Sequence, residues 1–181
     1  MHVRLALVLP VLLAACSAVA GDAPAAFPPE CGRFTRDVTN ELAALRLPSI
    51  AVVAGRGDDA GATRIEPGTR HDIRLHPQRG VTLATAPGKA VPDHAMAGLL
   101  VFRVPEDGRY RVSLTTAHWV DVVDGGRVLA SLDHEGRRGC PLLRKVVEFE
   151  LAAGRDLVLQ LVGPAADETG GVITAAPAGA E

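Results

Sequence analysis

The chain has 181 residues and nearly balanced charge, with 19 lysines and arginines against 21 aspartates and glutamates. This length suits one domain with a hydrophobic core of its own, and the scattered charges exclude the basic footprint of a nucleic-acid-binding protein. Aromatic residues are only 3% of the chain, so the core must be built mainly from Val, Leu, Ile and Ala, and a sugar-binding platform of several rings is hard to assemble.

Residues 1–15 have the three parts of an export signal: Arg4 as the lone basic group, an apolar stretch from Leu5 to Leu13, and small residues before Cys16. The stretch is too short to span a bilayer, which takes ~20 apolar residues. Leu13-Ala14-Ala15-Cys16 is a sequence that a lipoprotein signal peptidase reads, so we expect Cys16 to carry lipid, and several acyl chains would anchor it firmly. Cleavage after Ala20 is the alternative, because Ala18-Val19-Ala20 fits the rule for soluble secreted proteins.

Ser17 follows the cysteine, with no aspartate there, which resembles bacterial lipoproteins sorted to the outer membrane. We therefore expect an exported protein, lipid-anchored to the bacterial outer membrane and facing the periplasm; the soluble periplasmic or secreted form is the alternative. After Cys16, the segment up to residue 30 is rich in Ala, Pro and Gly. It cannot bury enough apolar area to fold, so residues 16–30 are expected to form a flexible tether.

The other two cysteines, Cys31 and Cys140, are an even pair if Cys16 carries lipid. In an oxidising compartment such a pair forms a disulfide that persists. It would close a loop of more than 100 residues, worth about 4 to 5 kcal/mol in chain-entropy models. Free thiols or a metal site are the alternatives, but two cysteines without CxxC spacing make poor zinc ligands.

One helix is predicted, over Thr35–Arg46, because Val38, Leu42 and Leu45 fall on one face and Thr35 can cap its start. Short strands bounded by Gly or Pro follow. Paired glycines at Gly125-Gly126 predict a type I′ hairpin turn, and Val172–Thr174 is expected as a last edge strand. The expected strands before it are Ile50–Ala54, Asp72–His76, Val81–Thr85, Leu99–Val104, Tyr110–Thr116, His118–Asp124, Arg127–His134, Leu142–Leu151 and Leu157–Val162.

This spacing predicts a mainly β fold: a single antiparallel β-sandwich or jelly roll with one short N-terminal helix. We expect the sandwich domain to cover residues 31–175 and a frayed tail to cover residues 176–181.

The most distinctive segment of the domain is Trp119–Asp124, in which Trp119 and Asp121 share one face. A two-residue hairpin loop would place Asp121 opposite Ala130 and Trp119 opposite Leu132. A buried aspartate needs a donor or a cation, and the candidates are Arg144 and Lys145. We therefore take Trp119, Asp121, Arg144 and Lys145 as a candidate ligand site; a rim aspartate beside a core tryptophan is the alternative.

Metal, cofactor and catalytic motifs give no further candidate. The histidines form no His-x-His or His-x-x-x-His pair, and Asp133-His134-Glu135 adjoins a Gly-Arg-Arg-Gly loop and is expected to be solvated. No serine lies in a Gly-x-Ser-x-Gly turn. We expect no metal site and no cofactor, and we assign no catalytic residue.

Several segments together resemble a group of small exported bacterial proteins without an established function: Phe34–Arg46, Gly108–Leu114, Trp119–Val123, and Gly139-Cys140 followed by Arg144-Lys145. Some members of that group carry a homogentisate 1,2-dioxygenase label, but that enzyme would need a much longer cupin-bearing chain with clustered His and Glu ligands. The run Gly108–Gly163 is also loosely similar to β-sandwich modules appended to secreted bacterial peptidases, an analogy of fold alone.

The sequence thus favours a non-enzymatic binding or envelope-associated module. It would contact the membrane through its N-terminal lipid anchor, and no motif indicates a protein or small-molecule partner. A metal-dependent oxygenase-like enzyme and a soluble secreted ligand-binding domain are the alternatives.

Overall fold

A computed structural model describes residues 26–57, 63–88 and 90–177. The expected signal peptide, the Cys16 lipidation site, the alternative cleavage at Ala20 and the first ten residues of the tether lie outside the described residues. In the described part of the chain, no helix is long and apolar enough to cross a membrane.

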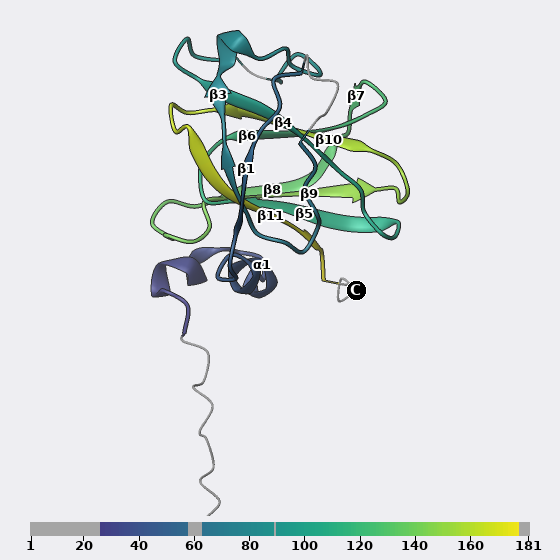
Figure 1. Ribbon diagram of the computed structural model, residues 1–181. Helices are drawn as coiled ribbons and strands as arrows, with labels where there is room; N and C mark the ends of the chain where they lie inside the picture. The colour runs from purple at the N-terminus through teal and green to yellow at the C-terminus, as the bar shows by residue number, and fades with distance from the viewer. Residues whose placement is uncertain (1–25, 58–62, 89, 178–181) are drawn as a thin grey trace, which may run out of the picture.

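The fold is mainly β, as predicted, with two sheets that face each other as a β-sandwich (Figure 1). All strand pairs are antiparallel except β1 with β2. The six-stranded sheet has the order β1 (Ile50–Val53), β2 (His71–Arg74), β11 (Glu168–Ala175), β5 (Gly108–Leu114), β9 (Lys145–Leu151) and β8 (Ser131–Gly136). The five-stranded sheet has the order β3 (His76–Pro77), β4 (Met96–Phe102), β10 (Leu157–Gly163), β6 (Trp119–Asp124) and β7 (Arg127–Val128).

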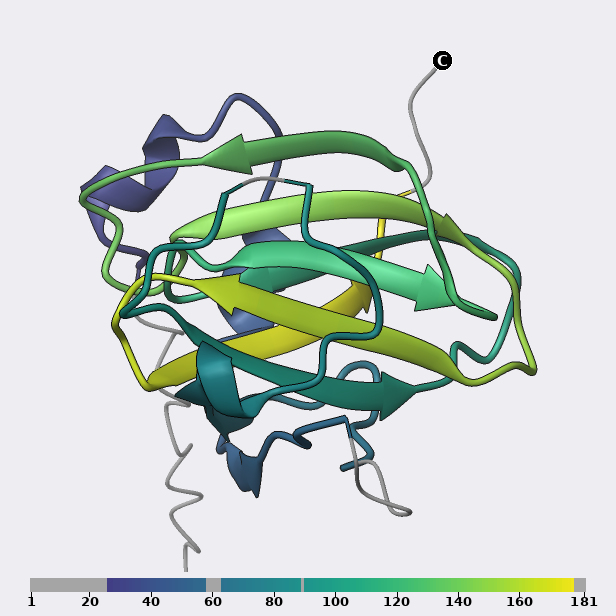
Figure 2. The same ribbon diagram turned by 90° about the horizontal axis from the view of Figure 1, so that it is seen from above.

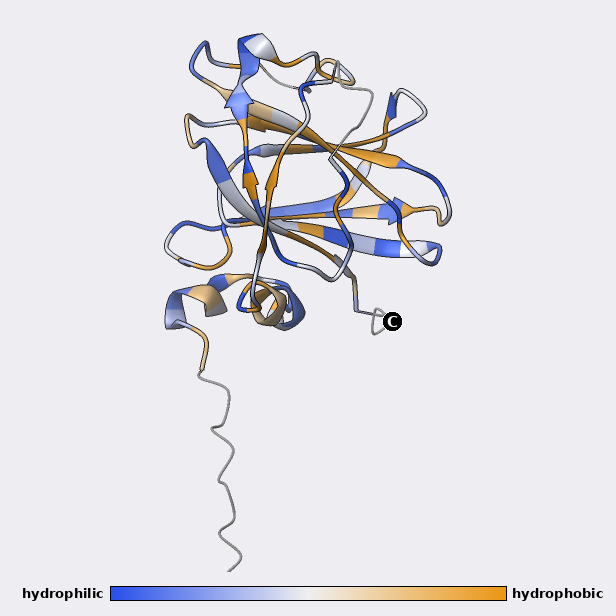
Figure 3. Ribbon diagram, in the orientation of Figure 1, coloured by the Kyte–Doolittle hydropathy of each residue, from blue (hydrophilic) through white to orange (hydrophobic). Residues whose placement is uncertain are grey.

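The core lies between the two sheets because apolar residues alternate along the strands. Leu157, Leu159 and Leu161 of β10 face it from one sheet, and Val147 and Phe149 of β9 face it from the other. Figure 3 shows strands of the core such as β4 and β10 coloured largely hydrophobic, whereas β8 is largely hydrophilic. Viewed from above, β8 forms one edge of its sheet (Figure 2).

A helical layer formed by residues 26–47 packs on the outer face of the six-stranded sheet (Figure 1). It contains the 3-10 helix η1 (Pro29–Arg33) and α1 (Thr39–Ala44). Its apolar residues pack on Val146 of β9 and Val172 of β11, and the predicted disulfide between Cys31 and Cys140 is confirmed, with the Cα atoms 4.6 Å apart. The bridge and the apolar contacts together hold this layer on the sheet.

The helix is shorter than the predicted Thr35–Arg46 because its first residues bond elsewhere. The backbone N–H and the hydroxyl of Thr35 donate to the Glu135 carboxylate of β8, at 3.0 and 2.9 Å, so Thr35 does not cap a helix. The Asp37 carboxylate then accepts the Thr39 N–H at 2.9 Å, in a turn that precedes α1.

Three strand predictions are also wrong in this part of the fold. Asp72–His76 is divided between β2 of one sheet and β3 of the other. Val81–Thr85 is not a strand: after η2 (Gln78–Gly80) it runs over the outer face of the five-stranded sheet, where Val81 packs on Leu99 and Val162. Val172–Thr174 is not an edge strand but part of β11, in the middle of its sheet between β2 and β5. Gly170 and Gly171 make this segment resemble a loop in the sequence, yet a Cβ at Gly170 would lie 2.8 Å from Thr115. The glycines are thus consistent with close packing of a central strand.

Candidate functional site

The hairpin that follows β6 ends early and leaves a gap at the edge of the sandwich. Gly125 and Gly126 have φ angles of 55° and 82°, as the predicted type I′ turn requires. Beyond the turn, β7 pairs with β6 only at Val123 and Asp124, and the Leu129 N–H donates to the Val122 carbonyl at 2.8 Å.

The chain then crosses to the other sheet, so the predicted strand Arg127–His134 is divided between β7 and β8. Ser131 pairs with Phe149 of β9 instead of lying opposite β6. The expected pairs Asp121–Ala130 and Trp119–Leu132 are therefore wrong. β8 belongs to one sheet and β6 to the other, so these two strands do not pair. A space is therefore left between them at the edge of the sandwich.

A pocket of ≈80 Å³ lies at this gap, and we call it the edge notch. Residues of β6 from one sheet and of β8 and β9 from the other line it. The ammonium of Lys145 lies 5.3 Å from the centre of a Trp119 ring, close enough for a cation–π contact. The structure thus brings together two of the predicted ligand-site residues. The full lining is Trp119, Val120, Ser131, His134, Lys145 and Val147.

Asp121 does not line the edge notch, although it supports one wall of it. Its carboxylate accepts from the Trp119 indole N–H at 2.8 Å and from the Gln160 amide at 3.2 Å. The donors are therefore Trp119 and Gln160 rather than the expected Arg144 or Lys145. Gln160 is itself fixed by two hydrogen bonds to the backbone of Thr85. This chain of contacts fixes the orientation of the indole.

The alternative of a rim aspartate beside a core tryptophan is wrong on both counts. Asp121 is only 6% exposed, whereas Trp119 is half-buried at the notch. Arg144, the fourth predicted residue, is not part of the lining: its backbone N–H donates to Leu114, and its guanidinium lies near Gly136.

Ser131 and His134 are lining residues that the sequence did not indicate. His134 is exposed on the edge strand, as expected, but it pairs with Val147 of β9 at the wall of the notch. The register between β8 and β9 would have located both residues, and that register includes an irregularity between Ser131 and Asp133. No carboxylate is among the lining residues, and Lys145 supplies a cation, so the notch favours an anionic group.

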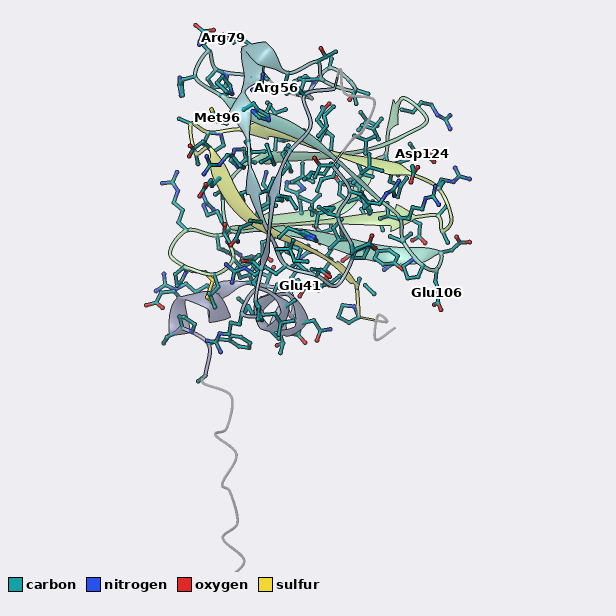
Figure 4. All side chains as sticks on the ribbon, in the orientation of Figure 1. Glu41, Arg56, Arg79, Met96, Glu106 and Asp124 are labelled. Atoms are coloured by element: carbon teal, nitrogen blue, oxygen red, sulfur yellow. A yellow bond between two sulfur atoms is a disulfide. The ribbon has the colours of Figure 1, made fainter. Side chains whose placement is uncertain are left out.

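A buried ionic network holds β8 in place beneath the helical layer. Arg111 of β5 donates through Nε to Glu148 at 2.9 Å and through Nη1 to Glu41 of α1 at 3.3 Å. Figure 4 shows Glu41 between the helical layer and the six-stranded sheet. Arg36 forms ion pairs with Glu148 and with Glu135 of β8, each at 3.6 Å, and also contacts Asp133. The network therefore joins α1, β5, β9 and β8.

Opposite charges and hydrogen bonds in this network shift the pKa values of Arg111 and Glu135. Burial acts to lower the pKa of the Arg111 guanidinium, but the hydrogen bond to Glu148 and the charge of Glu41 outweigh it, and the pKa is raised. Burial acts to raise the pKa of Glu135, but hydrogen bonds from Thr35 and the charge of Arg137 hold it below its usual value. Glu135 is 8% exposed, so its predicted solvation is wrong.

Larger hollows lie elsewhere, and one of ≈330 Å³ beside β1 and β2 also carries charged groups, from Asp72, Arg74 and Glu168. A second of ≈330 Å³ is formed by residues 27–42 of the helical layer alone, and another of ≈270 Å³ is lined mainly by glycines and aliphatic residues such as Leu99 and Val158. The edge notch instead combines an aromatic ring, an ammonium, an imidazole and a hydroxyl from three strands. Such convergence is typical of binding sites.

Comparison with known proteins adds no family to this description: no protein-family model matches the chain, and no curated protein matches it either. Among residues 26–57, 63–88 and 90–177, no group of three or more histidines, cysteines, aspartates or glutamates is placed to hold a metal ion.

Proposed function

We propose that this protein is an exported lipoprotein of the bacterial outer membrane, facing the periplasm, whose β-sandwich is a non-enzymatic binding module. The sequence Leu13-Ala14-Ala15-Cys16 supports the lipid anchor. The observation that carries the binding function is the edge notch, where Trp119, Lys145 and His134 converge from both sheets. The resemblance to small exported bacterial proteins agrees with this proposal.

The chemistry of the lining supports recognition of a ligand. Lys145 provides charge, Trp119 provides an aromatic wall, and Ser131 provides a hydroxyl that can donate or accept. Together these groups can hold a polar or anionic ligand through charge, an aromatic face and a hydrogen bond.

Trp119 is the only tryptophan of the sequence, so its fluorescence reports directly on the notch. The binding function is tested by titrating purified protein with small organic acids, amino acids, short peptides and sugars. We expect at least one class to change the Trp119 emission saturably, and Lys145→Met to weaken that change. Arg109→Met is the matched control: it also removes a positive charge, but Arg109 is exposed and its position pairs with Glu150, at the other end of β9 from Lys145. A response that is equally strong in Lys145→Met, or no response to any class, would contradict the proposal.

The anchor is tested separately by labelling cells with palmitate. We expect label on the wild-type chain and none on Cys16→Ser. Label that persists in Cys16→Ser contradicts lipidation at that residue, and an intact mass that begins after Ala20 identifies the soluble form instead.

A further inference from the structure

Along the side of β6 that pairs with β7, the edge notch lies where the next hydrogen-bonded residue pair would form. We call each such pair a rung. In an antiparallel pair, hydrogen-bonded rungs fall at every second residue. Leu129 donates to Val122 at 2.8 Å, so the next rung would join Val120 to residue 131. Ser131 pairs with β9 instead. The backbone N–H and C=O of Val120 therefore face the notch, at a point where strand pairing along this side of β6 has stopped within the described residues.

The opposite wall of the notch supplies a cation. Lys145 begins β9, and its ammonium lies over the Trp119 ring at 5.3 Å. An ammonium has three N–H donors, so it can keep its present contacts and still donate to a ligand. Ser131 and His134 provide further polar atoms, and the lining contains no carboxylate that would repel an anion.

The size of the notch limits what can enter. A cavity of roughly 10–15 Å³ holds one water, and the notch has a volume of ≈80 Å³. Only a few small groups fit, such as a carboxylate with the amide next to it. The bulk of any larger ligand has to lie outside, along the open edge formed by β8.

We propose that the edge notch binds the C-terminal residue of a peptide; this inference rests on the proposed binding function and names its ligand class. The peptide's last amide N–H donates to the Val120 carbonyl, which completes the missing rung. The terminal carboxylate accepts from the Val120 N–H and from the Lys145 ammonium. Only this one rung forms, because Leu129 already occupies the place opposite Val122, so the residues before the C-terminal one leave the notch along β8. Carboxylate capture and pairing with an exposed strand edge are both recurrent modes of peptide recognition.

The test compares acetyl-trialanine bearing a free carboxylate with the same peptide ending in an amide, using Trp119 emission of the purified protein. We expect saturable binding of the acid and binding of the amide that is weaker by ~10-fold or more, because the charge-assisted hydrogen bonds are lost. Lys145→Met should lose the preference for the acid, Lys145→Arg should keep it, and Arg109→Met should behave as wild type.

Three results overturn this inference. Equal binding of acid and amide would show that the carboxylate is not recognised. Binding of acetate as tight as that of the peptide acid would show that no rung is formed with Val120. A Trp119 signal that responds to neither peptide but does respond to other compounds would remove the peptide ligand and leave the proposed binding function standing. Because the comparison of acid with amide is made on the wild-type chain, it does not depend on the folding of any variant.

Discussion

Replacement of Arg111 by methionine tests whether the buried ionic network holds the helical layer and β8 on the sheet. The change leaves Glu41, which is 0% exposed, with the Thr174 hydroxyl at 3.1 Å as its remaining hydrogen-bond partner among the described residues, whereas Glu148 keeps Arg36 at 3.6 Å. Removing one partner of a buried pair costs about 3–5 kcal/mol. We expect a loss of this size, carried mainly by the isolated Glu41 carboxylate.

The free energy of unfolding is measured by urea titration at pH 7, followed by circular dichroism. In the double variant Glu41→Leu, Arg111→Met, both buried charges are gone, so the loss should be smaller than in the single variant. Arg74→Met is the control, because Arg74 and Glu168 pair at 2.8 Å with side chains 64% and 62% exposed; we expect a change within about 1 kcal/mol. The reasoning is refuted if Arg111→Met costs no more than this control, or if the double variant is less stable than the single one.

Three further predictions concern the bridge, a buried histidine and a packed glycine. In urea unfolding, the double variant Cys31→Ser, Cys140→Ser should have a free energy of unfolding lower by about 4–5 kcal/mol, because the bridge spans a separation of 109 residues. Reduced wild-type protein should lose a similar amount. An unchanged midpoint would contradict the prediction. Burial lowers the pKa of His71 from its usual 6.5, so the unfolded state binds more protons than the folded state below that pH. The free energy of unfolding should therefore fall as the pH drops below about 6.5. His71→Asn should flatten this dependence, and an unaltered pH profile would show that other groups cause it. Gly98→Ala would place a Cβ 2.3 Å from Ala54 in the adjacent segment and should lower the free energy of unfolding by about 1–3 kcal/mol. Gly32→Ala has nothing within 4 Å of the new Cβ and should lower it less. Similar melting temperatures for the two variants would contradict the packing argument.

Local patterns predicted the parts of this fold that local physics decides. Alternation in Leu157, Leu159 and Leu161 indicated a half-buried strand, and paired glycines indicated the turn at Gly125-Gly126. The even pair of cysteines indicated the disulfide. Each of these signals needs only neighbouring residues or a count of residue types.

The edge notch could not be predicted in the same way, because distant contacts create it. The Glu135 carboxylate is bound by Thr35, 100 residues away, and this contact helps to hold β8 under the helical layer rather than beside β6. Hairpin geometry alone placed residue 131 opposite Val120. The sequence offered Lys145 as a cation for Asp121, whereas in the structure the Lys145 ammonium contacts the Trp119 ring and the indole N–H donates to Asp121.

The most direct measurement of the central claim is an amide map of the ¹⁵N-labelled protein titrated with acetyl-trialanine. We predict that the largest shift changes fall on the backbone amides of Val120, Ser131 and His134 and on the Trp119 indole N–H, which all lie at the edge notch. Changes centred on the helical layer, in the hollow formed by residues 27–42, would contradict the account and place the ligand elsewhere.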